Sequence, residues 1–77
     1  MQLTLFDILF APIPPSAEEI RAAGYSKADI TMGWLRLSRL LRQSIEEDGW
    51  RDPSLRQQCE AQLRLGERNF RDVIDEL

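Results

Sequence analysis

The sequence contains no histidine and only one cysteine, Cys59. Histidine is the most frequent general base and metal ligand at neutral pH, so its absence removes the usual catalytic triads and zinc sites. A lone cysteine cannot close a disulfide within the chain, and Cys59 falls on an apolar helix face with no histidine to activate its thiol. We therefore expect a protein that is not an enzyme, with no catalytic residue, no metal ligand and no cofactor.

The chain also lacks a surplus of positive charge and any long apolar run. It carries 13 acidic and 10 basic residues, and Lys27 is the only lysine. Phosphate neutralisation requires surplus basic residues, so this balance argues against nucleic acid as a partner. Asp7 interrupts the apolar run 3–13, and the run is shorter than the about 20 residues that a membrane span needs. A signal peptide would have basic residues before its apolar run, and none precedes this one. We expect a cytoplasmic protein without membrane contact.

Residues 1–15 differ in composition from the rest of the chain. The first ten, MQLTLFDILF, are apolar on both faces of an extended segment, so the protein's own core or a partner must cover them. The next five, APIPP, form a proline-rich connector that favours an extended conformation. The sequence predicts an extended apolar arm with its connector over 1–15 and a small helical domain over 16–77.

Capping signals divide that domain into three helices. Ser16, with Glu19 three residues later, fits a capping box at the start of a short helix that Gly24 ends. A second helix begins near Ser26, with Asp29 three residues later, and runs to about residue 48. A third begins at the pair 52–53, an aspartate followed by proline, and runs to residue 77.

Each of the two long helices carries one apolar stripe, which predicts an antiparallel helical hairpin. The fold class is therefore all-α, a short helix plus this hairpin, with the extended arm at the N-terminus. In the hairpin register Gly66 falls opposite Trp34. A glycine inside a helix costs about 1 kcal/mol relative to alanine, and room for the indole would justify that cost. The stripes are Ile30, Trp34, Leu37, Leu41 and Ile45 on one helix and Leu55, Cys59, Leu63, Gly66, Phe70, Val73 and Leu77 on the other.

The arm contains a short recognition motif, Gln2-Leu3-Thr4-Leu5-Phe6. It resembles the pentapeptide by which DNA polymerases, mismatch-repair proteins and plasmid initiators bind the bacterial sliding clamp, the β subunit of DNA polymerase III. The resemblance implies that Gln2 hydrogen-bonds at a small polar subsite, that Leu5 and Phe6 fill a hydrophobic cleft, and that Leu3 packs at its rim. It covers five residues and identifies no family for the helical body.

An ordinary structural role competes with this one. A three-helix body of this size needs apolar cover, and the apolar residues of the arm would complete its core. The two hypotheses predict opposite environments for Leu5 and Phe6.

The second helix offers two further candidate surfaces. Met32, Leu35, Arg36 and Arg39 form a mixed apolar and arginine patch away from the seam, as protein interfaces often carry. The same patch is where the arm could fold back. The segment 19–30 also resembles a helix-turn-helix, whose recognition helix would present Lys27, Asp29 and Thr31 to DNA.

The expected function is protein binding. The first hypothesis is a small regulator or adaptor, of phage or plasmid type, that docks on the sliding clamp through Gln2, Leu3, Leu5 and Phe6. The second is a dimeric helical interaction protein, such as an inhibitor or antirepressor, whose arm belongs to the core. The third is a DNA-binding regulator.

Overall fold

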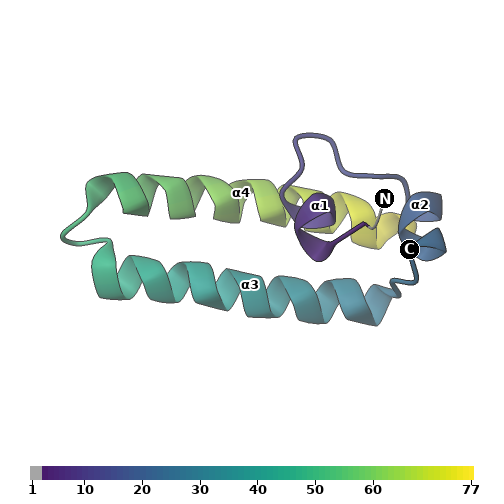
Figure 1. Cartoon of the computed structure of the whole chain (residues 1–77), viewed down its shortest axis with the longest axis horizontal. Helices are drawn as coiled ribbons and strands as arrows, with labels where there is room; N and C mark the ends of the chain where they lie inside the picture. Colours follow the sequence, from purple (N-terminus) through teal and green to yellow (C-terminus); the bar gives the residue numbers. More distant parts are fainter. Residues whose placement is uncertain (1–2) are drawn as a thin grey trace.

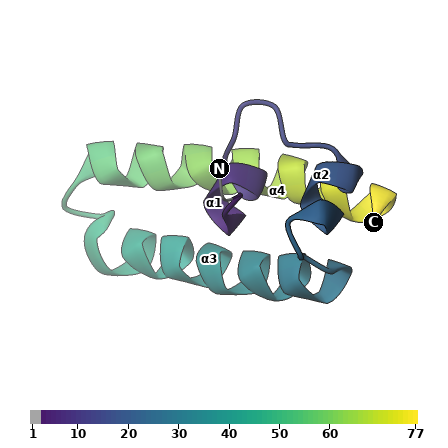
Figure 2. The same ribbon diagram turned by 45° about the vertical axis from the view of Figure 1, so that its right-hand side comes forward.

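The computed structural model describes residues 3–77, which form four helices and, within that range, no strand. The two long helices, α3 (Lys27–Asp48) and α4 (Pro53–Glu76), lie side by side and antiparallel (Figures 1 and 2). Two short helices, α1 (Leu5–Leu9) and α2 (Ala17–Ala22), pack toward the open end of this hairpin (Figure 1). The all-α class and the antiparallel hairpin predicted from the sequence are confirmed.

The two helices of the hairpin start at the residues predicted from the sequence, and side-chain capping bonds mark both starts. The Ser26 hydroxyl accepts a hydrogen bond of 3.2 Å from the Asp29 amide, and the Asp29 carboxylate accepts one of 2.9 Å from the Ser26 amide. Asp52 caps α4 by accepting a 3.1 Å bond from the amide of Leu55. Gly24 has φ 93°, the left-handed conformation expected of the residue after a helix.

The capping box predicted at Ser16 is only half formed. The Ser16 hydroxyl accepts a 3.2 Å bond from the Glu19 amide, and this is the side-chain cap of α2. The reciprocal bond from the Ser16 amide to the Glu19 carboxylate is not among the hydrogen bonds of residues 3–77.

The extended conformation predicted for the arm is wrong for Leu5–Leu9, which form α1. Thr4 and Asp7 make a full capping box, with bonds of 3.2 Å from the Asp7 amide to the threonine hydroxyl and 2.9 Å from the Thr4 amide to the carboxylate. A box of this kind satisfies two amides that a helix start leaves free, so a short helix can form here. The helix ends before the proline-rich connector, which arches over α4 to α2 (Figures 1 and 2).

The close contact predicted between Trp34 and Gly66 is confirmed. A Cβ atom on Gly66 would overlap Cζ3 of Trp34 and would lie 2.9 Å from Cε1 of Phe10. The indole packs between Phe10 and Phe70, with ring centroids 6.3 and 6.2 Å away. Only a glycine at this point of α4 leaves room for three aromatic rings at the seam.

The arm is part of the core. Ile8 and Leu9 of α1 are fully buried, as are Ile20 of α2 and Ile30 of α3. Burial of one such side chain is worth about 1.5–3 kcal/mol, so α1 contributes substantially to stability. The hairpin alone would leave the apolar surface around Trp34 and Phe70 without this cover.

Candidate protein-binding surface

The N-terminal motif is partly turned toward the protein itself. Gln2 lies outside the described residues. Leu3 is half-buried, and its carbonyl accepts a 3.1 Å hydrogen bond from the hydroxyl of Tyr25. Leu5 packs against α3 at Gly33, where an added Cβ would lie 2.8 Å from Cδ1 of Leu5. Leu3 and Leu5 are therefore engaged by the protein's own fold.

Phe6 points the other way. It is 59 % exposed, and its ring centroid lies 5.4 Å from that of Phe10. Leu3, Leu5 and Phe6 are the apolar motif residues that the structure describes. Among these three, Phe6 alone exposes most of its surface to solvent. A partner that buries Leu5 as well as Phe6 must first separate α1 from α3.

Asn69 of α4 holds the far end of the arm. It is completely buried, and its Nδ2 donates hydrogen bonds of 2.8 Å to the carbonyl of Leu9 and 2.7 Å to that of Ala11. Arg68 adds a 3.0 Å bond to the carbonyl of Pro12. The role of Asn69 was not predicted from the sequence. The sequence did contain one indication of it: Asn69 is a polar residue three positions after Gly66, beside the apolar stripe. A buried amide at such a position needs hydrogen-bond partners.

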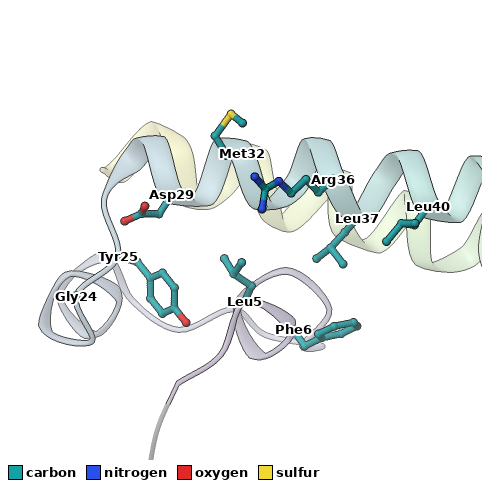
Figure 3. Close-up of a pocket in the computed structure, with 10 residues that line it drawn as sticks. Leu5, Phe6, Gly24, Tyr25, Asp29, Met32, Arg36, Leu37 and Leu40 are labelled. Atoms are coloured by element: carbon teal, nitrogen blue, oxygen red, sulfur yellow. The ribbon is translucent and has the colours of Figure 1, made fainter.

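A cleft of about 730 Å³ opens between α1 and α3. Figure 3 shows Leu5 and Phe6 on the α1 side and Leu37 and Leu40 on the α3 side of this cleft, with Tyr25 at one end. The walls are mostly apolar side chains, and Arg36 is the basic group among them. A lining of this kind favours an apolar group over a charged one, because burying an unpaired charge is costly.

A second depression of about 430 Å³ adjoins the first and is formed by α3 alone. We call its lining the α3 face: Met32, Leu35, Arg36, Arg39 and Leu40. The structure thus brings together all four residues of the second interface predicted from the sequence. Leu40 was not predicted from the sequence, although it lies one turn after Arg36 and outside the seam stripe.

The apolar members of this surface are largely exposed. The exposed fractions are 51 % for Met32, 56 % for Leu35 and 59 % for Leu40. Met32, Arg36 and Leu40 line both hollows, so the α3 face is continuous with the cleft that Phe6 borders. One mixed apolar and basic surface therefore runs from α1 along α3.

The arginines of this surface have no acidic partner within residues 3–77. The ion pairs there are Arg51–Asp48, Arg56–Glu60 and Arg71–Glu67, and none involves Arg36 or Arg39. Asp29 borders the cleft, but its carboxylate accepts the Ser26 bonds, and these bonds hold its pKa below the ordinary value. The α3 face is therefore locally positive on a chain of net charge −3.

The residues proposed to read DNA make bonds within their own helix. Asp29 caps α3 through Ser26, and the Thr31 hydroxyl donates a 2.8 Å bond to the carbonyl of Lys27. In the described part of the chain no group of three or more acidic, cysteine or histidine side chains is arranged to hold a metal ion. None of the helices in residues 3–77 combines the length and apolarity needed to cross a membrane.

Comparisons of the chain with models of protein families, with curated proteins and with solved structures found no match.

Proposed function

We propose that this protein is a non-enzymatic protein-binding module whose N-terminal arm belongs to the folded core and whose binding surface is the α3 face together with Phe6. The observation that carries the proposal is the exposure of Phe6, Met32, Leu35 and Leu40 beside one another. Monomeric proteins expose few contiguous apolar patches, and those they do expose often bind partners. Unpaired arginines within the patch fit the same role, because arginine is enriched at protein interfaces.

The test compares two variants that each remove two exposed apolar side chains. Leu35→Gln/Leu40→Gln changes the α3 face, and Ile13→Gln/Trp50→Gln changes the connector and the hairpin turn. Each immobilised protein is used to capture partners from cells that carry its gene, and a captured protein is then purified and titrated. We expect wild type and the control to bind equally and the α3 face variant to bind at least about 30-fold more weakly, since a hot-spot side chain is worth about 2 kcal/mol. Partners that the α3 face variant retains in full would contradict the proposal.

Docking on the sliding clamp is a second candidate, and the exposed side chain of Phe6 within the pentapeptide supports it. Because Leu5 packs on α3 and Leu3 accepts a bond from Tyr25, the clamp would compete with the protein's own hairpin for these residues. The apparent dissociation constant is then the intrinsic one divided by the fraction of molecules with a released arm. Loosening the arm should tighten clamp binding.

Purified clamp would be titrated with wild type, Leu5→Ala/Phe6→Ala and Tyr25→Phe, with helicity followed by circular dichroism. The double variant should bind about 30-fold more weakly or worse. Tyr25→Phe removes one hydrogen bond of about 1 kcal/mol and should bind up to about fivefold more tightly. No binding by wild type excludes this candidate, and an unchanged affinity of Tyr25→Phe would mean that the clamp does not require release of the arm.

A further inference from the structure

We infer that the segment that docks on the α3 face is an acidic amphipathic helix of a partner protein. The inference rests on the proposed function and adds the chemistry of the partner to it. Three properties of the surface carry it: its shape, the spacing of its apolar side chains and its charge.

The α3 face is a depression along one helix, and it opens into the groove between α1 and α3. α3 is a 22-residue helix, and α1 stands beside it with Phe6 at the edge of the cleft (Figure 3). An amphipathic helix that lies in such a groove buries its apolar side chains and leaves its polar side exposed. Met32 suits this arrangement, because its flexible thioether adapts to the shape of a partner.

The spacing matches helix packing. Met32, Leu35 and Arg39 follow one another at steps of three and four, the pattern by which one helix packs along another. The aliphatic stem of an arginine can extend such an apolar stripe while its guanidinium stays at the rim. A partner helix with apolar residues at the same steps would complete a second seam on the outer side of α3.

The positive charge of the α3 face indicates which residues should flank the apolar stripe of the partner helix. Arg36 and Arg39 are exposed and take part in none of the ion pairs of residues 3–77. Guanidinium groups pair well with carboxylates, often through two hydrogen bonds. Glutamate or aspartate beside the apolar stripe would meet these groups, whereas lysine or arginine there would be repelled.

The same charge argues against a second copy of this chain as the occupant. In a homodimer whose two-fold axis passes through the middle of the α3 face, Arg36 of one copy would face Arg36 of the other. The two Arg39 side chains would also lie near this axis. Like charges placed opposite one another at an interface destabilise the complex. Of the acids of α3, Glu46, Glu47 and Asp48 lie at its far end, and the Asp29 carboxylate already accepts the capping bonds of Ser26. Glu46 and Glu47 line a neighbouring hollow with Arg39 and lie outside the α3 face itself.

The test uses a designed fluorescent peptide of about three heptads, with leucine at positions a and d and glutamate at e and g. A second peptide carries lysine at e and g, and a third is a scrambled form of the first. Each is titrated with the full chain, and binding is followed by fluorescence anisotropy. We expect the glutamate peptide to bind at least about tenfold more tightly than the lysine peptide, which corresponds to about 1.4 kcal/mol.

Charge reversal supplies the decisive comparison. Arg36→Glu/Arg39→Glu should invert the preference and bind the lysine peptide more tightly, while the control Arg64→Glu/Arg71→Glu on α4 should keep the wild-type order. The inference is overturned if the wild type fails to bind the glutamate peptide, binds the scrambled form equally well, or shows no charge preference. It is also overturned if sedimentation shows a dimer that Leu35→Gln/Leu40→Gln dissociates, because a second copy then occupies the face.

The two proposals fail in different ways. If Leu35→Gln/Leu40→Gln loses its cellular partner but the wild type ignores the glutamate peptide, the protein-binding function stands and the acidic helix does not. If the variant keeps every partner, the function itself fails.

Discussion

Substitution of Gly66 by alanine sets two opposing effects against each other. Alanine in a helix interior is favoured over glycine by about 1 kcal/mol. Against this, the new methyl group would overlap Cζ3 of Trp34 and lie 2.9 Å from Cε1 of Phe10. Overpacking of a core costs about 1–3 kcal/mol, and rigid rings on two sides favour the upper part of that range. We expect Gly66→Ala to be less stable by about 1–2 kcal/mol, which lowers Tm by about 4–16 °C in a chain of this size.

Gly33→Ala is the matched control. The atoms nearest to its new Cβ are Cδ1 and Cδ2 of Leu5, at 2.8 and 3.0 Å. These are the ends of a flexible side chain on a five-residue helix, so Leu5 can shift. The gain of about 1 kcal/mol in helix propensity is then offset only in part, and the variant should be as stable as wild type or slightly more stable.

Urea and thermal unfolding followed by circular dichroism would measure both variants. In a Trp50→Phe background the tryptophan emission reports Trp34 alone, since the chain has two tryptophans. The emission should change on Gly66→Ala and stay unchanged on Gly33→Ala. Equal or greater stability of Gly66→Ala, with unaltered Trp34 emission, would refute the packing argument.

Two further predictions concern the arm and the helix caps. Asn69→Ala should destabilise the protein by about 2–4 kcal/mol, because one buried and one partly buried carbonyl of the arm lose their donor and a cavity remains; an unchanged urea midpoint would contradict this. The capping amides of Thr4 and Ser26, and then the hydroxyls of the same residues, lower the pKa of Asp7 and Asp29. The folded pKa of each carboxyl is thus below its unfolded value, so the stabilisation is complete above about pH 4 and is lost as the pH falls through the folded pKa. Urea midpoints measured across this acidic range should fall less steeply for Asp7→Asn/Asp29→Asn than for wild type, and equal slopes would mean that these boxes do not contribute to acid sensitivity.

The hairpin could be predicted from the sequence because its signals are long and agree with one another. Apolar residues recur at steps of three and four along α3 and α4, and both helices have marked starts. Once the chain turns near residue 50, the register is set, and it places Gly66 opposite Trp34. Local pattern and tertiary packing select the same arrangement.

The arm could not be predicted in the same way. Leu5–Leu9 is too short for a helical period to show, and apolar residues on all its sides fit a strand equally well. The pair Thr4 and Asp7 was the one local signal for a helix. The bonds from Asn69 to the arm join residues about 60 positions apart, and no pattern within either segment specifies such a pairing.

Part of the candidate surface could be predicted, because several of its residues lie on one long helix. Met32, Leu35, Arg36 and Arg39 share one side of a long helix, so the helical period alone places them together. The contribution of α1 to the cleft depends on how the arm docks. The sequence therefore indicated the α3 face but left open that Leu5 turns inward and Phe6 outward.

The bonds between Asn69 and the arm also set an order of events during translation. The ribosome makes the arm before its anchoring residue, because Leu9 precedes Asn69 by 60 positions. At about 5–20 residues per second, roughly 3–12 s pass between the synthesis of the two. Throughout that interval the nascent chain carries an apolar arm without the donor that binds its carbonyls in the folded protein. Chaperones, or any protein that recognises the N-terminal peptide, therefore meet it most readily on polysomes and on chains that stop short of Asn69.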